Sequence, residues 1–269
     1  MVAFGAVLGA LCLFSTEPDH HAIMVVKTVA ARSGELVVLV SANAEWKVVR
    51  GRYASAPVTA TPYGEWFPLE VPVAGRPPRA VGFFHGGWGN IAAAGSTQYA
   101  ALRWKPELIV NLGTCGGFRG AVEKGEVLLV DKTIVYDIVE EMGDAAEAIA
   151  YYTTSLDVAW AGSRLPEGVR RGPLISADRD LLPADAPRLR SSYGAVAADW
   201  ESGAIAWVAR ANGVPLLILR GVTDLVGPEG GEAYGNLGLF EEGARRVMNR
   251  LLDDLPWWIG RWEAARARP

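Results

Sequence analysis

Short, mainly apolar segments alternate along this 269-residue chain with segments of helical spacing. The apolar segments have the length of buried strands. They are residues 36–41, 79–84, 107–112 and 214–219, with shorter ones at 126–130, 133–136, 173–176 and 195–198. Short segments of helical spacing begin at residue 44 and after residue 201, and longer ones extend over 91–104 and 239–252. Buried strands that alternate with helices predict a largely parallel sheet covered on both faces, in a single domain without repeats.

Composition narrows the class of protein. Half of the residues are hydrophobic and 21% are charged, so the chain can bury a substantial core. The net charge of −4 gives no basic surface for a nucleic acid. Two cysteines, Cys12 and Cys115, make no disulfide framework, and we expect a cytoplasmic protein. His20, His21 and His85 are too few and too scattered for a metal site, so no metal is expected.

The amino-terminal residues 1–14 are apolar, but no basic segment precedes them and no small-residue cleavage site follows. They are also too few to span a bilayer. Met24 offers a second plausible start, so residues 1–23 are interpreted as an extension or an overcalled start. We expect residues 24–269 to form one catalytic domain that does not enter a membrane.

Two carboxylates stand at neighbouring strand ends. Glu201 opens a helix within Asp199-Trp200-Glu201-Ser202, and Asp224 lies just past the end of the strand at 214–219. In α/β sheets ligands bind at that edge. Two acids in one pocket suit the cleavage of a glycosidic bond, in which positive charge develops on the sugar. The alternatives are structural: an ion pair of Asp224 with Arg220, and a helix-dipole role for Glu201.

Glycine clusters follow two of the strands, at 86–89 and 113–117. They let the backbone approach a ligand, or they simply form tight turns. Neither has the Gly-x-Gly-x-x-Gly spacing of a dinucleotide site. The sequence therefore predicts no nicotinamide or other cofactor.

Three segments in order resemble the signatures of the nucleoside phosphorylase/nucleosidase superfamily. They are Asn111-Leu112-Gly113-Thr114-Cys115-Gly116-Gly117, Asp199-Trp200-Glu201-Ser202 and Leu219-Arg220-Gly221-Val222-Thr223-Asp224. The resemblance extends from residue 36 to the carboxyl terminus, and within the superfamily it is strongest to the 5′-methylthioadenosine/S-adenosylhomocysteine nucleosidases. It implies a three-layer α/β/α fold around a mixed, twisted sheet, a small-molecule nucleoside substrate and a homodimer.

The resemblance also implies roles for single residues. Asp224 matches the acid that protonates purine N7 as the bond breaks, and Thr223 would orient its carboxyl. Burial in such a pocket raises the pKa of a carboxyl, which keeps its proton available near neutral pH. Glu201 matches the glutamate that binds the ribose hydroxyls. Asp199 is interpreted as a helix N-cap without a chemical role.

Other positions are expected to contact substrate. Trp200 stands where the family often has methionine, and its bulk would reshape the pocket for the 5′ substituent. Gly113 and Thr114 are placed near the ribose or the attacking water. Asp180, or alternatively Asp178, would contact the edge of the base.

Glu45 decides between two reactions. Phosphorylases of this fold bind phosphate with an arginine near this position and another just after residue 110, where this chain has Glu45 and Asn111. A carboxylate would repel phosphate but could accept a proton from water. The sequence thus predicts an N-ribosyl hydrolase that acts on 5′-methylthioadenosine or a related 5′-modified adenosine. The alternatives are a phosphorylase with Arg119 or Arg220 as phosphate ligand, and a nucleoside-sensing domain without catalysis.

Overall fold

The computed structural model describes residues 35–267. The extension considered at 1–23 lies outside these residues. Within them the strands are β1 (Leu36–Val40), β2 (Thr59–Ala60), β3 (Glu65–Val73), β4 (Arg76–His85), β5 (Leu108–Phe118), β6 (Val127–Val135), β7 (Thr153–Ser155), β8 (Val169–Ser176), β9 (Ala197–Asp199), β10 (Leu216–Gly227) and β11 (Gly230–Gly231). The helices are α1 (Asn43–Arg52), α2 (Asn90–Trp104), α3 (Ala145–Tyr151), α4 (Ala186–Tyr193), α5 (Ser202–Ala211) and α6 (Leu237–Arg266), with a 3-10 turn η1 (Ala159–Ala161).

The strands form one mixed, eleven-stranded sheet. β1 is parallel to both of its neighbours, β4 and β5, and β5 is parallel to β10. β9 runs antiparallel to β5, and β6 runs antiparallel to β10. Because β8 pairs with both β6 and β9, the strands β5, β9, β8, β6 and β10 close a ring. The predicted α/β fold with a central mixed sheet is confirmed.

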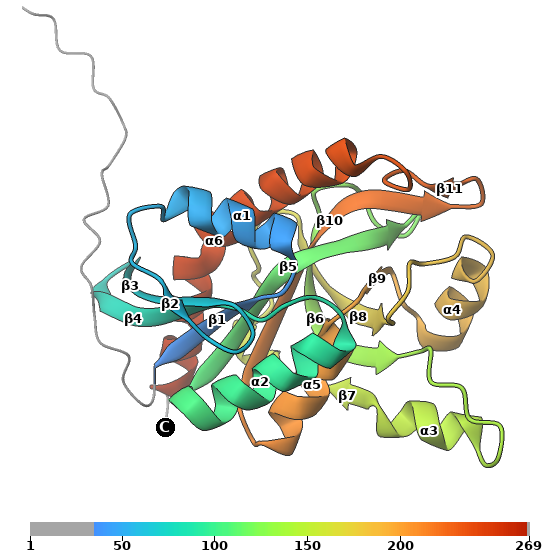
Figure 1. Ribbon diagram of the computed structural model, residues 1–269, viewed down its shortest axis with the longest axis horizontal. Coiled ribbons are helices and arrows are strands. Elements are labelled where there is room, and N and C mark those ends of the chain that lie inside the picture. Colours follow the sequence, from blue (N-terminus) through green and yellow to red (C-terminus); the bar gives the residue numbers. More distant parts are fainter. Residues whose placement is uncertain (1–34, 268–269) are drawn as a thin grey trace, which may run out of the picture.

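Helices cover both faces of the sheet, with α1 and α6 on one side and α2 and α5 on the other (Figure 1). The residues of β1 show how the faces are filled, because successive side chains of a strand point to opposite faces. Leu36, Val38 and Val40 belong to the core beneath α1 and α6. Val37 and Leu39 belong to the core beneath α2 and α5. All five are fully buried, which explains the continuous apolar run in the sequence.

Two strands are longer than predicted. The strand predicted at 214–219 is β10, which continues to Gly227, so Asp224 lies within the strand and not just past its end. β10 remains paired with β5 along this length, with an irregularity between Val222 and Asp224. At Gly117 a Cβ would lie 2.5 Å from the Val122 side chain and 2.7 Å from that of Val222, so a larger residue would force these side chains to move. The glycine cluster at 113–117, for which a tight turn was one interpretation, is part of β5.

Three further elements differ from the sequence prediction in their bounds or were not predicted. The segments predicted as separate strands at 126–130 and 133–136 form one strand, β6, with a register shift between Val130 and Lys132. β3 was not predicted, because Pro68 and Pro72 interrupt its pattern. It lies between β4 and the two-residue edge strand β2, where proline is tolerated. α6 is longer than the predicted 239–252 and contains Pro256.

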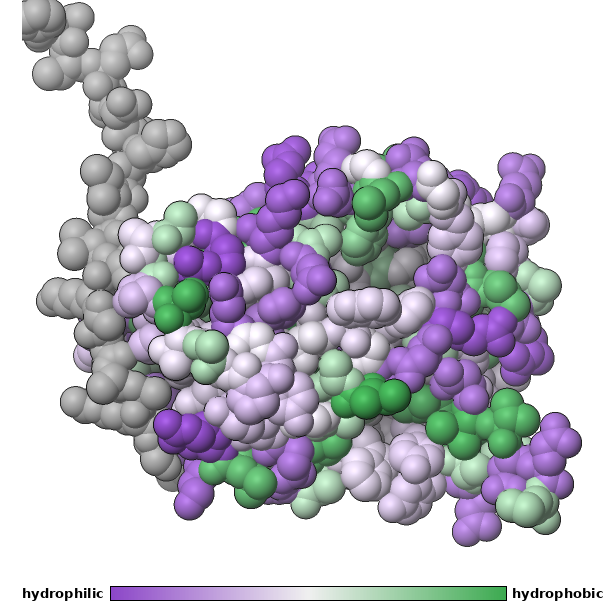
Figure 2. Space-filling model, viewed as in Figure 1, coloured by the Kyte–Doolittle hydropathy of each residue, from purple (hydrophilic) through white to green (hydrophobic). Residues whose placement is uncertain are grey.

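The two tryptophans near the end of α6 have different surroundings. Trp258 is fully buried in the core beneath α1 and α6, whereas Trp257 is 36% exposed. Of the two roles left open for this segment, core packing therefore applies to Trp258. Figure 2 shows mainly hydrophilic side chains along the edge where Figure 1 places α6. None of the helices within residues 35–267 is both long enough and apolar enough to cross a bilayer.

The buried tryptophan predicts a difference in stability between two neighbouring substitutions. Trp258→Ala should lower the free energy of unfolding by about 3–5 kcal/mol, because it removes a fully packed ring and leaves a cavity. Trp257→Ala should lower the free energy of unfolding by about 1 kcal/mol or less, because its ring is partly exposed and contacts the Arg261 guanidinium. Urea unfolding followed by circular dichroism measures both, and equal losses would contradict the assignment.

Candidate active site

A pocket of about 810 Å³ opens toward the carboxyl ends of β1, β5 and β10. Its walls come from segments far apart in the sequence. They are residues 42–45, 114–116, 179–181, 198–201, 223–224 and 233–237, with Trp88, Val226 and Phe240. Seven of the eight predicted site residues line this pocket: Glu45, Thr114, Asp180, Trp200, Glu201, Thr223 and Asp224. The fold thus brings together residues that are up to 179 positions apart in the chain.

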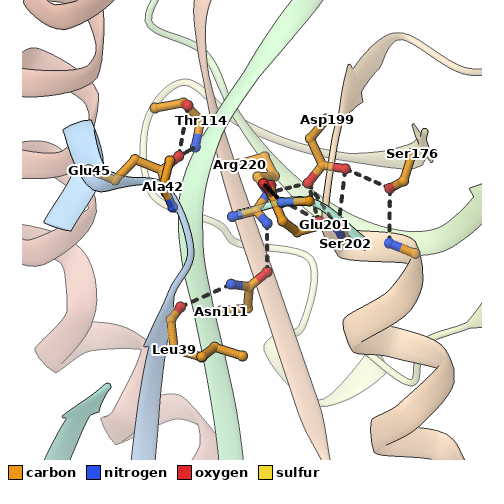
Figure 3. A network of polar contacts seen from close by, with 12 residues as sticks. Leu39, Ala42, Glu45, Asn111, Thr114, Ser176, Asp199, Glu201, Ser202 and Arg220 are labelled. Atoms are coloured by element: carbon orange, nitrogen blue, oxygen red, sulfur yellow. Dashed lines mark hydrogen bonds and ion pairs between the residues drawn. The ribbon is translucent and has the colours of Figure 1, made fainter. Parts of the chain in front are cut away.

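Glu45 lies in the first turn of α1 and is buried. Its Oε1 accepts hydrogen bonds from the N–H (2.6 Å) and the Oγ1 (2.8 Å) of Thr114, and its Oε2 accepts one from the Ala42 N–H (3.2 Å). Both donors of Thr114 are therefore directed at Glu45 (Figure 3). Burial raises the pKa of Glu45, and the positive charge of Arg220 and these hydrogen bonds offset only part of that effect.

Arg220 is fully buried behind the pocket wall. Its Nε donates to Asp199 Oδ2 at 2.7 Å and to Ser202 Oγ at 3.0 Å, and its Nη2 donates to Asn111 Oδ1 at 2.8 Å (Figure 3). The ion-pair partner of Arg220 is thus Asp199, and not Asp224 as one interpretation of the sequence proposed. The Asp199 carboxylate also accepts the Ser202 N–H at the start of α5.

Gly113 does not line the pocket but makes room for Arg220. A Cβ at this position would lie 2.0 Å from Arg220 Nη1 and 3.0 Å from Glu45 Oε1. Any side chain at position 113 would therefore displace the guanidinium or the carboxylate. Arg220 Nη1 has no hydrogen-bond partner among the described residues. Arg220 Nη1 and Glu45 Oε1 both lie beside the Cα of Gly113, where a larger residue would place its Cβ.

Glu201 is buried at the residue preceding α5, and its side chain does not cap that helix. Its Oε1 instead accepts the Gly89 N–H at 3.0 Å. The pKa of Glu201 is raised to about 8, chiefly by burial and next by the negative charge of Asp199, against a smaller opposing effect of Arg220. The next amide, that of Asn90, donates to Asp178 Oδ1 at 2.6 Å. Asp178 therefore fixes the loop before α2 and is not among the residues that line the pocket.

Asp224 accepts a hydrogen bond from Thr223 Oγ1 at 2.6 Å, and the same hydroxyl lies 3.3 Å from the Cys115 carbonyl oxygen. A hydroxyl has one proton, so the two contacts alternate with the protonation state of Asp224. When Asp224 is protonated it can donate to Thr223, which then donates to Cys115. Burial raises the pKa of Asp224, and the hydrogen bond from Thr223 offsets only part of the rise.

Aromatic side chains at the rim of the pocket were not all predicted from the sequence. Trp200 is half-buried, and its ring centroid lies 5.6 Å from that of Trp88, which is 59% exposed. Trp88 belongs to the glycine-rich loop 86–89, so its position in the pocket depends on the contacts of that loop with Glu201. Tyr234, in the segment before α6, and Phe240, in the first turns of α6, were also missed as pocket residues, because neither belongs to a recognisable motif.

The raised pKa of Glu201 predicts a change of stability with pH. An unfolded glutamate titrates near 4.5 and the folded one near 8, so between these values the native state holds a proton that the unfolded state has released. The free energy of unfolding should therefore fall as pH rises through this window, by up to about 1.4 kcal/mol per pH unit. Below 4.5 both states are protonated and the effect vanishes.

Glu201→Gln should remove this part of the pH dependence, while Glu147→Gln on the exposed face of α3 should keep it. Urea unfolding at a series of pH values between 5 and 8 measures the difference from wild type. Glu45 and Asp224 also have raised pKa values and contribute to the pH dependence of both proteins. The contribution of Glu201 is therefore given by the wild-type curve minus the Glu201→Gln curve. Parallel curves for wild type and Glu201→Gln would contradict the assignment.

Comparison with known proteins gives three consistent findings. A family model described as the phosphorylase superfamily matches residues 26–255. A 5′-methylthioadenosine/S-adenosylhomocysteine nucleosidase of a Geobacillus species (strain WCH70) is 26% identical over 160 residues, which is 55% of this chain and 69% of the relative. One from a Marinomonas species (strain MWYL1) is 24% identical over the same length and shares.

Solved structures with a similar fold include the Streptococcus pneumoniae MTA/SAH nucleosidase in complex with 8-aminoadenine. It has a TM-score of 0.68 at 18% identity and covers 84% of this chain and 99% of its own. The Helicobacter pylori 5′-methylthioadenosine/S-adenosylhomocysteine nucleosidase, in complex with butyl-thio-DADMe-Immucillin-A, has a TM-score of 0.68 at 15% identity, with 83% and 98% coverage. At these identities the two structures establish a common fold.

Proposed function

Since the chain belongs to the phosphorylase superfamily, we propose that it hydrolyses the N-glycosidic bond of a 5′-modified adenosine and releases adenine. The substrate class follows the nucleosidases that it resembles, for which 5′-methylthioadenosine is the simplest candidate. We also propose that residues 24–269 act as one catalytic domain, as a cytoplasmic homodimer that serves nucleoside metabolism and methionine salvage.

The scarcity of cationic side chains in the pocket is the observation that favours hydrolysis over phosphorolysis. Among the described residues that line it, five have carboxyl side chains and one, Arg179, has a cationic side chain. Such a site disfavours a phosphate dianion, which requires fixed positive donors. It favours a substrate whose ribose becomes positively charged as the bond breaks.

The two arginines considered as phosphate ligands are engaged elsewhere. Arg220 is buried, and its Nε and Nη2 are bonded to Asp199 and Asn111. Arg119 does not line the pocket, and its Nη2 lies 2.8 Å from Glu232 Oε1. These contacts support a hydrolase in which water, not phosphate, attacks C1′.

Three carboxyl groups divide the reaction between them. Asp224, whose pKa is raised by burial, donates a proton to purine N7, so that the base leaves as a neutral molecule. Glu201 accepts hydrogen bonds from the ribose hydroxyls and holds the sugar in place. Glu45 takes a proton from the water whose oxygen bonds to C1′, and the bonding electrons of the broken C–N bond pass to the base. The two hydrogen bonds from Thr114 orient the Glu45 carboxylate for this step.

Asp224→Asn tests the role of the acid. The amide keeps the shape of the side chain but cannot give N7 a proton, so kcat for 5′-methylthioadenosine should fall by about 10²–10⁴-fold. Adenine release measured by chromatography gives the rate, and circular dichroism shows whether the fold is kept. Asp253→Asn makes the same chemical change on the surface of α6 and should hydrolyse at the wild-type rate. Wild-type turnover by a folded Asp224→Asn variant would show that the acid lies elsewhere.

A further inference from the structure

One end of the pocket is bridged by a hydrogen bond that the proposed reaction does not use. The hydroxyl of Tyr234 donates to the backbone carbonyl of Leu181 at 2.6 Å. Both residues line the pocket, together with Asp180 and Asp224. The residue before Tyr234, Ala233, also lines the pocket, and its backbone lies near enough to the Asp224 carboxyl to lower the pKa of that group. Tyr234 therefore stands beside the group that would protonate the purine.

Contacts on both sides of Tyr234 hold it in this position. Its ring packs over Gly231, where a Cβ would lie 2.7 Å from the ring, and its N–H donates to the Gly231 carbonyl at 3.1 Å. Glu232 anchors the same segment through Lys124 (3.0 Å) and Arg119 (2.8 Å). The phenol is thus placed by the surrounding structure and does not depend on a ligand for its position.

The hydrogen-bonding capacity of Tyr234 follows from the bond to Leu181. A phenol has one proton, and this one is given to the Leu181 carbonyl. Burial, and the carboxyl groups of Asp180 and Asp224, raise the pKa of Tyr234, so the phenol keeps that proton. Its oxygen can then only accept further hydrogen bonds. The Asp180 carboxylate is also an acceptor. The neighbouring cation, Arg179, is directed toward Asp185, with 3.9 Å between Arg179 Nη2 and Asp185 Oδ2.

A purine presents N7 and its C6 substituent on the same edge. Adenine shows an acceptor at N7 and a donor at the 6-amino group, whereas a 6-oxopurine shows two acceptors. If Asp224 donates to N7, the C6 substituent faces the neighbours of Asp224. An amino group can donate to acceptors there, but a 6-oxo group would leave them unpaired, which a site built for hydrogen bonding penalises strongly.

We infer that Tyr234, held by Leu181, is a specificity-determining residue that together with Asp180 selects 6-aminopurines over 6-oxopurines. This inference rests on the proposed function for the position of the base in the pocket. It adds a side-chain basis for the choice of base, on a segment between β10 and α6 where the sequence shows no motif.

Binding of the free bases adenine and hypoxanthine, measured by isothermal titration calorimetry, tests the inference. Wild-type protein should bind adenine at least tenfold more tightly than hypoxanthine. Tyr234→Phe removes the accepting oxygen and should reduce this ratio at least fivefold, mainly through weaker adenine binding. Asp180→Asn replaces an acceptor by a group that can also donate, and it should reduce the ratio through tighter hypoxanthine binding. Tyr151→Phe removes an exposed phenol from α3, outside the pocket lining, and should leave the ratio unchanged.

An unchanged ratio in both Tyr234→Phe and Asp180→Asn would overturn the inference, as would equal affinity of the wild-type protein for the two bases or no binding of either. Binding of a free base requires no turnover, so the result is separable from the proposed reaction. A protein that selects adenine through Tyr234 but releases none from 5′-methylthioadenosine would refute the hydrolase and keep the inference. Turnover with an unchanged ratio would do the reverse.

Discussion

The buried guanidinium of Arg220 is the interaction on which the arrangement of the site depends. It links β10 to Asp199 on β9 and to Asn111 on β5, and Asn111 in turn donates to the Leu39 carbonyl of β1. A buried charge is tolerated only when it is paired and hydrogen-bonded, so these strands must meet as they do. Gly113 leaves the space that the guanidinium occupies. One cation therefore orders the strand ends from which the pocket is built.

That single cation does not balance the acids around it. Asp199 forms an ion pair with Arg220. Glu45 and Glu201 form none with it within 4.0 Å, although its positive charge lowers the pKa of each. Because burial disfavours ionised carboxyl groups, the pKa values of both glutamates are raised. A nucleoside whose sugar becomes positively charged suits a pocket lined by carboxyl groups, whereas a phosphate dianion would find Arg179 as the one cationic side chain among the described lining residues. Burial thus accounts for most of the rise in both glutamate pKa values, and the scarcity of free cationic side chains favours water over phosphate as the nucleophile.

Much of this could be predicted from the sequence because it depends on local patterns. Apolar runs identified the central strands, and since ligands bind where such strands end, Glu201 and Asp224 were expected to share a pocket. Glu45 and Thr114 were added to it by the resemblance to the nucleosidases. Features that depend on distant partners were missed. Arg220 has its partner Asp199 on another strand, 21 positions earlier, whereas the sequence suggested Asp224, four positions later. Tyr234 acquires its role through Leu181, 53 positions away, so no local signal could have identified it.

The most direct test of a hydrolase is to incubate the protein with 5′-methylthioadenosine, with and without inorganic phosphate, and to identify the products by chromatography. A pocket lined by carboxyl groups, with Arg179 as its one cationic lining residue among those described, predicts free adenine and methylthioribose, formed at equal rates in both samples. Methylthioribose 1-phosphate, formed only when phosphate is present, would contradict the account.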